Sequence, residues 1–362
     1  MSPDRPTSPP TPPGPRPGRS EDNPRSPGAR SPERPGAPRP SAPTTTTTPP
    51  STTSPLPRAT SLLLAPFSFL YALFARLRAR RYSGRGRRLG KPVLSVGNLT
   101  FGGTGKTPFV IHACHELSRR GKRVAILSRG YRGGPGGNDE AKVIARHLEG
   151  VVHLEDPDRF AAGSRIAAET DVFVLDDGFQ HLPLFRDHDV VLVDATDPFG
   201  GGFCPPAGRL REPLSALDRA TLVVITRADL VDRASLGETM RRIRERTAAP
   251  VVTTAFLARC DVPLDGMAVT VACGIGNPRA FALMVERLGA RIAERRFFRD
   301  HHAYTRADVT ALAVHGRPVV VTEKDAVKLE PLWPPRPPLI TVGIELEILD
   351  GAAHLEALFD RP

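Results

Sequence analysis

Short apolar runs alternate with longer amphipathic stretches along the chain from Pro92 onward. The runs are rich in Val, Ile and Leu, as is typical of strands buried on both faces. They are Pro92–Val96, Arg123–Leu127, Asp171–Leu175, Asp189–Val193 and Thr221–Thr226. Helices are predicted between them, notably over Pro108–Arg120 and Ala161–Thr170. This alternation predicts an α/β fold with a doubly wound, mostly parallel sheet.

The alternation loosens over Phe256–Met267 and then resumes in a smaller α/β unit. The elements predicted for this unit are a strand over Ala268–Ala272, a helix over Pro278–Leu288 and a strand over Pro318–Val321. We therefore predict two domains, at 92–262 and 263–362. Residues 1–57 hold 19 of the 39 prolines and are predicted to be a disordered tail, because such a segment buries too little apolar area to offset its ordering entropy.

The segment 58–91 combines an apolar run with a basic cluster. The run Leu62–Ala75 would form a helix about 21 Å long, short of the ~30 Å hydrocarbon core of a bilayer. The basic residues after it are Arg76, Arg78, Arg80, Arg81, Arg85, Arg87, Arg88 and Lys91. This order favours an N-terminal membrane-associating helix that enters an anionic cytoplasmic leaflet. The alternative is a core helix with a solvated basic end.

The distribution of charge and the spacing of the cysteines argue against several classes of protein. Residues 1–91 hold 16 Lys/Arg and 4 Asp/Glu, whereas the chain as a whole carries a net charge of +11. The remainder is therefore near neutral, which argues against binding of nucleic acid. The four cysteines show no C-x-x-C spacing, so neither a zinc site nor a disulfide framework is predicted.

A glycine-rich loop lies between the first predicted strand and the first predicted helix. It reads T-F-G-G-T-G-K-T, comprising Thr100, Phe101, Gly102, Gly103, Thr104, Gly105, Lys106 and Thr107. Strand, glycine loop, Lys-Thr and helix in this order predict a phosphate-binding loop of the P-loop NTPase type. Lys106 would bind the β- and γ-phosphates, and the Thr107 hydroxyl would bind Mg²⁺. Thr100 stands where the usual motif has its first glycine.

Charged residues follow several predicted strands. Asp176 and Asp177 come directly after an apolar run, where carboxylates suit Mg²⁺. The glycine-rich segment Ser128–Glu140 contains Arg129 and Arg132, which are candidate phosphate partners, and ends near Asp139. A solvated acidic turn and a solvated loop are the alternatives.

Three further segments are less specific. Cys204–Pro213 holds Arg211 and Glu212 between prolines, as in a rigid loop that positions substrate. Phe297–Tyr304 holds His301 after an aspartate, which suggests proton transfer as readily as it suggests a surface turn. Thr322–Lys328 reads by itself as the solvated start of a helix.

Together these segments resemble the tetraacyldisaccharide 4′-kinase family of lipid A synthesis in Gram-negative bacteria. The matching runs include S-V-G-N-L-T-F-G-G-T-G-K-T-P, S-R-G-Y, N-D-E, L-D-D-G-F-Q-H, P-A-G-R-L-R-E-P, G-I-G-N-P, D-H-H and T-E-K-D-A-V-K, in family order from about Leu62 to Lys328. The resemblance implies ATP- and Mg²⁺-dependent phosphorylation of the 4′-hydroxyl of lipid-A disaccharide 1-phosphate. It also implies an N-terminal membrane-associating helix, which agrees with the interpretation of Leu62–Ala75, so we expect the protein at the cytoplasmic face of the inner membrane. We expect a monomer.

The resemblance also implies roles for individual residues. Asp139 falls on the catalytic carboxylate and His301 on the histidine that assists it, while Lys106 stabilises the transferred phosphoryl group. The residues expected to hold the metal are Thr107, Asp176, Asp177 and Glu212. Arg129, Arg211 and Gln180 are expected to contact the substrate. Because Asp139 and His301 come from different predicted domains, the active site is expected between those domains.

Two rival functions are considered. A P-loop GTPase or metallochaperone-type switch is favoured by V-V-I-T-R-A-D at Val223–Asp229, which resembles the guanine-reading [NT]-K-x-D, with Arg227 in place of lysine. A partitioning-type ATPase is disfavoured, because no additional lysine lies between Gly97 and Gly105.

Overall fold

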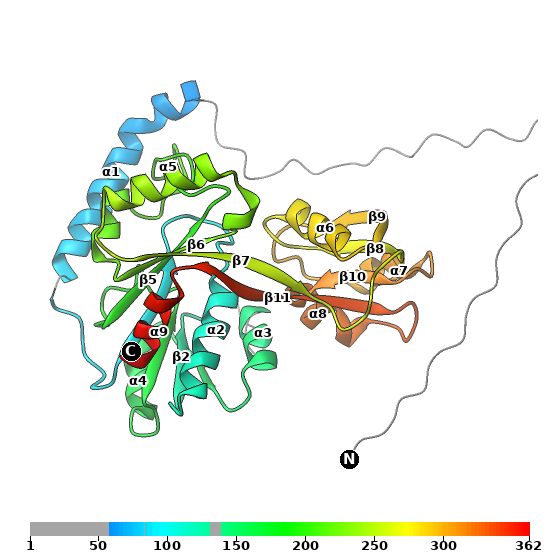
Figure 1. Cartoon of the computed structure of the whole chain (residues 1–362), viewed down its shortest axis with the longest axis horizontal. Coiled ribbons are helices and arrows are strands. Elements are labelled where there is room, and N and C mark those ends of the chain that lie inside the picture. Colours follow the sequence, from blue (N-terminus) through cyan, green and yellow to red (C-terminus); the bar gives the residue numbers. More distant parts are fainter. Residues whose placement is uncertain (1–57, 83, 131–138) are drawn as a thin grey trace, which may run out of the picture. The chain divides into compact units, whose positions relative to one another are not determined.

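The computed structural model describes residues 58–82, 84–130 and 139–362 (Figure 1). The predicted tail at 1–57 and the candidate Arg132 lie outside the described residues. Side chains of the first helix are described from Leu64 onward.

The described chain builds one sheet of eleven strands in the order β3-β2-β4-β1-β5-β6-β7-β11-β10-β8-β9. The strands are β1 (Val93–Asn98), β2 (Val124–Ser128), β3 (Val152–Glu155), β4 (Val172–Asp176), β5 (His188–Asp194), β6 (Leu222–Thr226), β7 (Val251–Arg259), β8 (Ala268–Cys273), β9 (Arg291–Phe297), β10 (Val319–Thr322) and β11 (Leu339–Asp350). Every neighbouring pair is parallel except β7 and β11. The predicted α/β fold with a mostly parallel sheet is confirmed.

Helices connect the parallel strands, and most begin at a side-chain cap. The helices are α1 (Arg58–Tyr82), α2 (Lys106–Arg119), α3 (Asp139–His147), α4 (Arg159–Ile166), α5 (Arg233–Arg244), α6 (Pro278–Arg287), α7 (Arg306–Ala313), α8 (Glu323–Leu329) and α9 (Ala352–Asp360), with 3-10 turns η1 (Leu214–Arg219), η2 (Ala228–Leu230) and η3 (Glu330–Leu332). Asp158, Asp232 and Thr322 accept hydrogen bonds from free N–H groups of the first turns of α4, α5 and α8. Such caps satisfy donors that the helix leaves unpaired.

The two long strands β7 and β11 join the larger and smaller parts of the sheet. The start of β7 pairs with β6, whereas its later residues pair with β11. The start of β11 runs parallel to β10, and from Gly343 onward β11 runs antiparallel to β7. The sheet therefore continues through this antiparallel pair (Figure 1).

The last helix, α9, returns to the core of the larger part. Leu355, Leu358 and Phe359 are buried in the same cluster as residues of β1, β4 and α2. Arg120, just after α2, pairs with Glu356 and, at 3.0 Å, with Asp360. The expected boundary at residue 262 stays a prediction, and the last helix of the expected second domain packs on the first.

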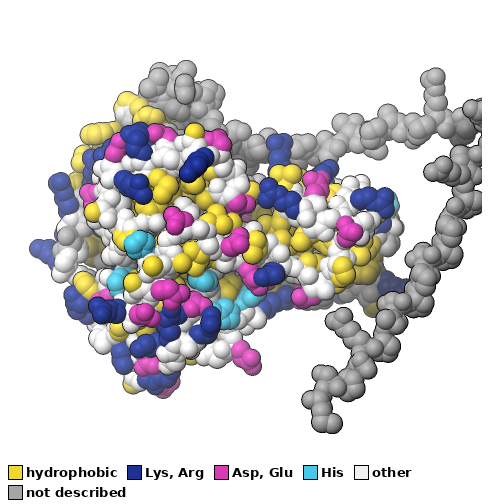
Figure 2. All heavy atoms as spheres, viewed as in Figure 1, with side chains coloured by type: hydrophobic (Ala, Val, Ile, Leu, Met, Phe, Trp, Pro, Cys, Tyr) yellow, Lys and Arg dark blue, Asp and Glu magenta, His cyan; other side chains and the backbone are white. Residues whose placement is uncertain are grey.

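Helix α1 is tied to the body through Ser68 and exposes a row of apolar side chains. The buried Ser68 hydroxyl accepts a hydrogen bond of 3.0 Å from the Ala207 N–H. The exposed apolar residues are Phe67, Phe69, Leu70, Tyr71, Leu73, Phe74 and Leu77. Hydrophobic side chains are visible along this helix (Figure 2). None of the described helices has the length and apolar character that crossing a membrane requires.

Candidate active site

The predicted phosphate loop connects the end of β1 to the start of α2. Gly105 precedes α2 with φ 86°, and an added Cβ there would lie 2.2 Å from Cζ of Phe256. Both the left-handed backbone and the close packing require glycine. The loop thus places the amino-terminal end of a 14-residue helix, with its unpaired N–H groups, at the carboxyl edge of the sheet.

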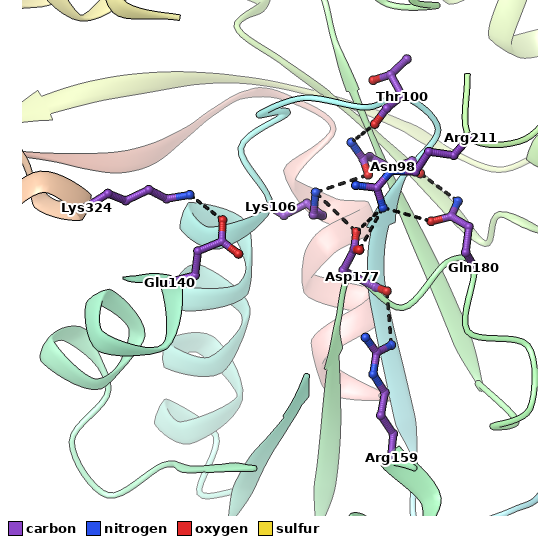
Figure 3. Close-up of polar contacts among 9 residues, drawn as sticks. All are labelled: Asn98, Thr100, Lys106, Glu140, Arg159, Asp177, Gln180, Arg211 and Lys324. Carbon is purple, nitrogen blue, oxygen red and sulfur yellow. Dashed lines mark hydrogen bonds and ion pairs between the residues drawn. The ribbon is translucent and has the colours of Figure 1, made fainter. Parts of the chain in front are cut away.

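Lys106 extends from this helix end toward Asn98 and Asp177. Its Nζ lies 3.3 Å from Oδ1 of Asn98 and 3.5 Å from Oδ1 of Asp177 (Figure 3). Asn98 is buried, and its Nδ2 donates to the Thr100 carbonyl at 2.7 Å. The amide therefore fixes both the lysine and the start of the loop. Sequence reasoning missed Asn98, whose only signal is its position at the end of a strand.

Asp177 lies at the centre of a group of cations (Figure 3). An Arg211 terminal nitrogen lies 2.8 and 2.9 Å from its two carboxylate oxygens, and Arg159 donates to its main-chain carbonyl at 3.2 Å. Burial raises the pKa of Asp177, but the charges of Lys106 and Arg211 outweigh burial, so the pKa lies below its ordinary value. Asp177 therefore stays ionised, and it adopts a left-handed φ of 50°.

Gln180 joins the same group from the segment after β4. Its Oε1 accepts from Arg211 at 3.4 Å and its Nε2 donates to the Asn98 carbonyl at 3.1 Å. The structure therefore brings together Lys106, Asp177, Gln180 and Arg211. Arg159 was missed by sequence reasoning because nothing in its local sequence distinguishes it from a surface arginine.

Asp176 is buried beside this group and is the side chain best suited to a metal. Burial, followed by the negative charge of Glu140, raises the pKa of Asp176 to about 6. Within the described part of the chain its Oδ1 has no hydrogen-bond partner. An unpartnered buried carboxylate oxygen fits a hard cation such as Mg²⁺. The buried Thr107, at the start of α2, supplies a hydroxyl oxygen to the same edge of the sheet.

Glu212 lies in a different contact. Both of its oxygens accept from Arg219 at 3.0 Å, and Arg219 lies over the ring of Phe179. Among the described residues no hydrogen bond or ion pair joins Glu212 to Lys106, Asp176 or Asp177. Its expected role as a metal ligand therefore stays a prediction without a contact to support it.

Asp139 and His301 meet although they come from distant parts of the sequence. Oδ2 of Asp139, the first residue of α3, lies 3.6 Å from Nδ1 of His301, a distance typical of an ion pair. The contact with His301 lowers the pKa of Asp139, burial opposes this, and the charge of Lys328 lowers it further. The same contact raises the pKa of His301 above its ordinary value.

Helix α8 carries three residues that contact α3. Lys328 lies 3.2 Å from Asp139, Lys324 pairs with Glu140, and Glu323 contacts His147. Figure 3 shows the Lys324–Glu140 pair extending between the two helices, near Lys106. The charges of Lys324, Lys106 and His301 lower the pKa of Glu140, although burial is the largest effect and raises it. The charges of Lys106, from the phosphate loop, and of His301 thus both act on Glu140.

Known proteins of one family resemble this chain along most of its length. The family model described as tetraacyldisaccharide-1-P 4′-kinase matches residues 60–361. A tetraacyldisaccharide 4′-kinase from Anaeromyxobacter sp. (strain Fw109-5) is 38% identical over 341 residues, which cover 83% of this chain and 92% of the relative. The chain belongs to the tetraacyldisaccharide 4′-kinase family.

Two further comparisons extend this result. The tetraacyldisaccharide 4′-kinase of Geobacter metallireducens is 36% identical over 332 residues, covering 83% of this chain and 97% of its own. A crystal structure of LpxK from Aquifex aeolicus, described as an "apo" form in complex with ATP, has a TM-score of 0.68 and 26% identity, covering 83% of this chain and 99% of its own. Membership of this kinase family does not favour the GTPase alternative.

Of the remaining expected residues, Arg129 and Phe101 are exposed and Thr100 is buried. Burial is the main reason that the pKa of Arg159 is lowered, and the charge of Arg129 adds to it, so Arg129 lies near the Asp177 group after β2. Phe101 is also exposed, and Arg211 lies over its ring. Thr100 is buried and pairs with Leu210 in an isolated antiparallel β-bridge. In the described structure it therefore supports the loop and is not exposed to solvent.

Helix α8 departs most from its sequence interpretation. Asp325, expected at the solvated start of a helix, is fully buried and accepts hydrogen bonds from the Tyr304 hydroxyl at 2.9 Å and the Gly274 N–H at 3.1 Å. Its Oδ1 also lies 3.5 Å from Lys328. Lys328 is therefore held between a fixed buried carboxylate and Asp139. The local sequence gives no indication of this role for Lys328.

Proposed function

We propose that this protein transfers the γ-phosphoryl group of ATP to the 4′-hydroxyl of lipid-A disaccharide 1-phosphate. Family membership supports the reaction, and the ATP complex of the related LpxK supports the nucleotide. The observation that carries the proposal is the contact between Asp139 and His301 at 3.6 Å. It provides a candidate proton acceptor next to Glu140, which itself lies near Lys106.

The phosphate loop binds the nucleotide in this account. Its free amides and the positive end of α2 attract the phosphates. Lys106 stabilises charge that builds up on the transferred group. Lys106 contacts Asp177, which keeps the ammonium group at the mouth of the loop.

Asp139 accepts the proton of the attacking hydroxyl, and His301 orients the carboxylate. A sugar hydroxyl is a poor nucleophile, so a positioned acceptor accelerates its attack. The lowered pKa of Asp139 keeps it ionised at neutral pH, ready to accept a hydrogen bond. Lys328 contacts the same carboxylate oxygen as His301 and is itself held by Asp325, so it helps to fix the carboxylate in place.

Thr107, Asp176 and Asp177 are the residues that we propose hold Mg²⁺. Mg²⁺ bound there would neutralise negative charge on the phosphates. The unpartnered Oδ1 of Asp176 supports this assignment. Arg129, Arg211 and Gln180 are proposed to contact the substrate, since they surround the same group of side chains.

Helix α1 is proposed to hold the enzyme at the cytoplasmic face of the inner membrane. Its exposed phenylalanines adjoin several arginines toward its carboxyl end. Apolar and cationic side chains on one helix favour binding at an anionic membrane surface. The acceptor is itself an amphiphile, so enzyme and substrate would meet at that surface.

The proposed function is tested by incubating the purified full-length chain with ATP, Mg²⁺ and lipid-A disaccharide 1-phosphate. The expected product carries one additional phosphate at the 4′ position of the distal sugar, as located by mass spectrometry and phosphorus NMR. A Lys106→Ala variant serves as the control for a contaminating kinase. Absence of this product, or a product made equally by the control, would contradict the proposal. GTP in place of ATP is expected to support less transfer.

A further inference from the structure

The carboxyl end of β6 contacts the back of the phosphate loop through two consecutive residues. The hydroxyl of Thr226, which is fully buried, donates to the Thr104 carbonyl at 2.9 Å. A terminal nitrogen of Arg227 donates to the Gly103 carbonyl at 3.1 Å. Neighbouring carbonyl groups of the loop are thus both held toward β6.

The planarity of the peptide bond makes these contacts informative about the loop amides. In a trans peptide the carbonyl and the following N–H point in opposite directions. Holding the carbonyls of Gly103 and Thr104 toward β6 therefore directs the N–H groups of Thr104 and Gly105 away from it. In the described part of the chain neither N–H donates a hydrogen bond to another residue. They remain available to an anion.

Arg227 is itself held by Asp194, at the end of the neighbouring strand β5. The Arg227 guanidinium forms an ion pair with Oδ2 of Asp194. The other carboxylate oxygen accepts from the N–H and the hydroxyl of Thr196 at 3.0 and 2.7 Å. Asp194 is therefore fixed on both sides. The chain of contacts runs from Thr196 through Asp194 and Arg227 to Gly103.

Two other features indicate that the backbone and side chain of Arg227 are constrained. Its backbone has a left-handed φ of 55°, which is unfavourable for a residue other than glycine. Its guanidinium lies 5.2 Å from the ring centroid of Phe256, within reach of a cation–π contact. The same ring packs against Gly105. Arg227 thus contacts the loop and the side chain that supports the loop.

We propose that Arg227, held by Asp194, is a positioning residue that sets the loop amides to bind the β-phosphate of the nucleotide. This inference rests on the proposed nucleotide binding and extends it to the segment that resembles a guanine-reading motif. In that segment Asp229, the residue that would read a base, lies 3.8 Å from Arg287 of α6. Arg227 contacts the phosphate loop instead. The segment therefore positions the loop that binds the phosphates and does not read the base.

The test compares binding of ATP, ADP and AMP by calorimetry to the full-length chain and to Arg227→Met. The variant loses the charge-assisted hydrogen bond to Gly103 and the ion pair with Asp194, so its affinity for ATP and ADP is expected to fall about 10- to 100-fold. AMP lacks the β-phosphate, so its affinity is expected to change by less than about threefold. In turnover assays KM for ATP is expected to rise by a larger factor than kcat falls.

Three further variants separate positioning from folding. Arg227→Lys keeps a cation and is expected to recover part of the affinity for ADP. Asp194→Asn is expected to weaken the binding of ADP, as Arg227→Met does. Arg123→Met removes an arginine that pairs with Asp171 at 2.8 Å, away from the loop, and should bind ADP as the unmodified chain does. Thermal unfolding of each variant shows that it is folded.

Several results would overturn the inference. One is that Arg227→Met and Asp194→Asn both bind ATP and ADP with affinities within about twofold of that of the unmodified chain. Another is an equal loss for AMP, which would mean that Arg227 supports the whole nucleotide site. If the unmodified chain binds ATP and ADP but phosphorylates no acceptor, the proposed function fails while the inference is still decided by the variants. If the unmodified chain binds neither nucleotide, both fail.

Discussion

The ammonium group of Lys328 lies 3.2 Å from Oδ2 of Asp139 and 3.5 Å from Oδ1 of Asp325. Asp325 is fixed by Tyr304, Gly274 and Thr322 in the core of the smaller part of the sheet. Asp139 begins α3 in the larger part. Lys328 therefore links the candidate catalytic carboxylate to a rigid buried group, and after His301 its charge also lowers the pKa of that carboxylate.

Replacing Lys328 by methionine is expected to shift the acid limb of the pH–rate profile. The nearby cation lowers the pKa of Asp139, so its removal raises that pKa, and the ionised carboxylate is then lost at a higher pH. The profile of kcat/KM should move to higher pH on its acid side. Lys328→Arg should move it less, and Lys122→Met, at an exposed position, should leave it in place. An acid limb at the same pH in Lys328→Met and the unmodified chain would show that Lys328 does not act on the titrating group.

Replacing His301 by asparagine is expected to lower turnover more than it lowers ATP affinity. His301 contacts Asp139, whereas Lys106, from the phosphate loop, contacts Asn98 and Asp177. Loss of an assisting group typically lowers kcat by about 10²-fold or more. Steady-state kinetics with calorimetry of ATP binding measure the two effects. An Asn variant that lost ATP binding and turnover equally would place His301 in the nucleotide site instead.

The exposed phenylalanines of α1 are expected to determine membrane binding. Phe67, Phe69 and Phe74 are 64%, 66% and 72% exposed. Replacing all three by serine should reduce sedimentation with vesicles of anionic phospholipid at least about tenfold, since each buried aromatic contributes about 1.5–3 kcal/mol. Replacing the exposed Leu283 and Val314 by serine is the matched control. Equal sedimentation of both variants would exclude α1 as the membrane contact.

Helix α9 is expected to stabilise the larger part of the sheet. Phe359 is 1% exposed and packs in the core cluster that contains β1 and α2. Phe359→Ala should lower the free energy of unfolding by about 3–5 kcal/mol, as measured by the denaturant midpoint. Leu283→Ala, at an exposed position of α6, should cost less than about 0.5 kcal/mol. A loss below about 1 kcal/mol for Phe359→Ala would mean that α9 contributes little to this core.

The phosphate loop could be predicted from the sequence because its residues are consecutive. Strand, glycines and Lys106-Thr107 form one local pattern, and α2 begins at Lys106. The strands β1, β2, β4, β5 and β6 were predicted for the same reason, since runs buried on both faces are continuously apolar. The strands β3 and β7 were not predicted, because they are only partly buried and lack a continuous apolar run. The pairing of Asp139 with His301 came from the family resemblance. Spacing along the chain does not indicate such a contact.

The residues that were missed all depend on tertiary contacts. Asn98 matters because Lys106 turns back toward the end of its strand. Lys328 and Asp325 looked solvated because their helix start is polar, yet α8 packs against α3 and the β10 region. The local sequence does not predict that β11 and α9 pack on the larger part either, because the pattern of an amphipathic helix does not indicate which sheet it packs against.

The central claim is that Asp139 acts on the acceptor hydroxyl while the loop at Lys106 binds the nucleotide. The most direct test is the single-turnover rate of phosphoryl transfer by Asp139→Asn, with ATP affinity measured on the same preparation. The account predicts a rate lower by about 10²–10⁴-fold and a Kd for ATP within about threefold of the unmodified chain. A near-normal transfer rate, or a loss of ATP affinity that accounts for the whole defect, would contradict it.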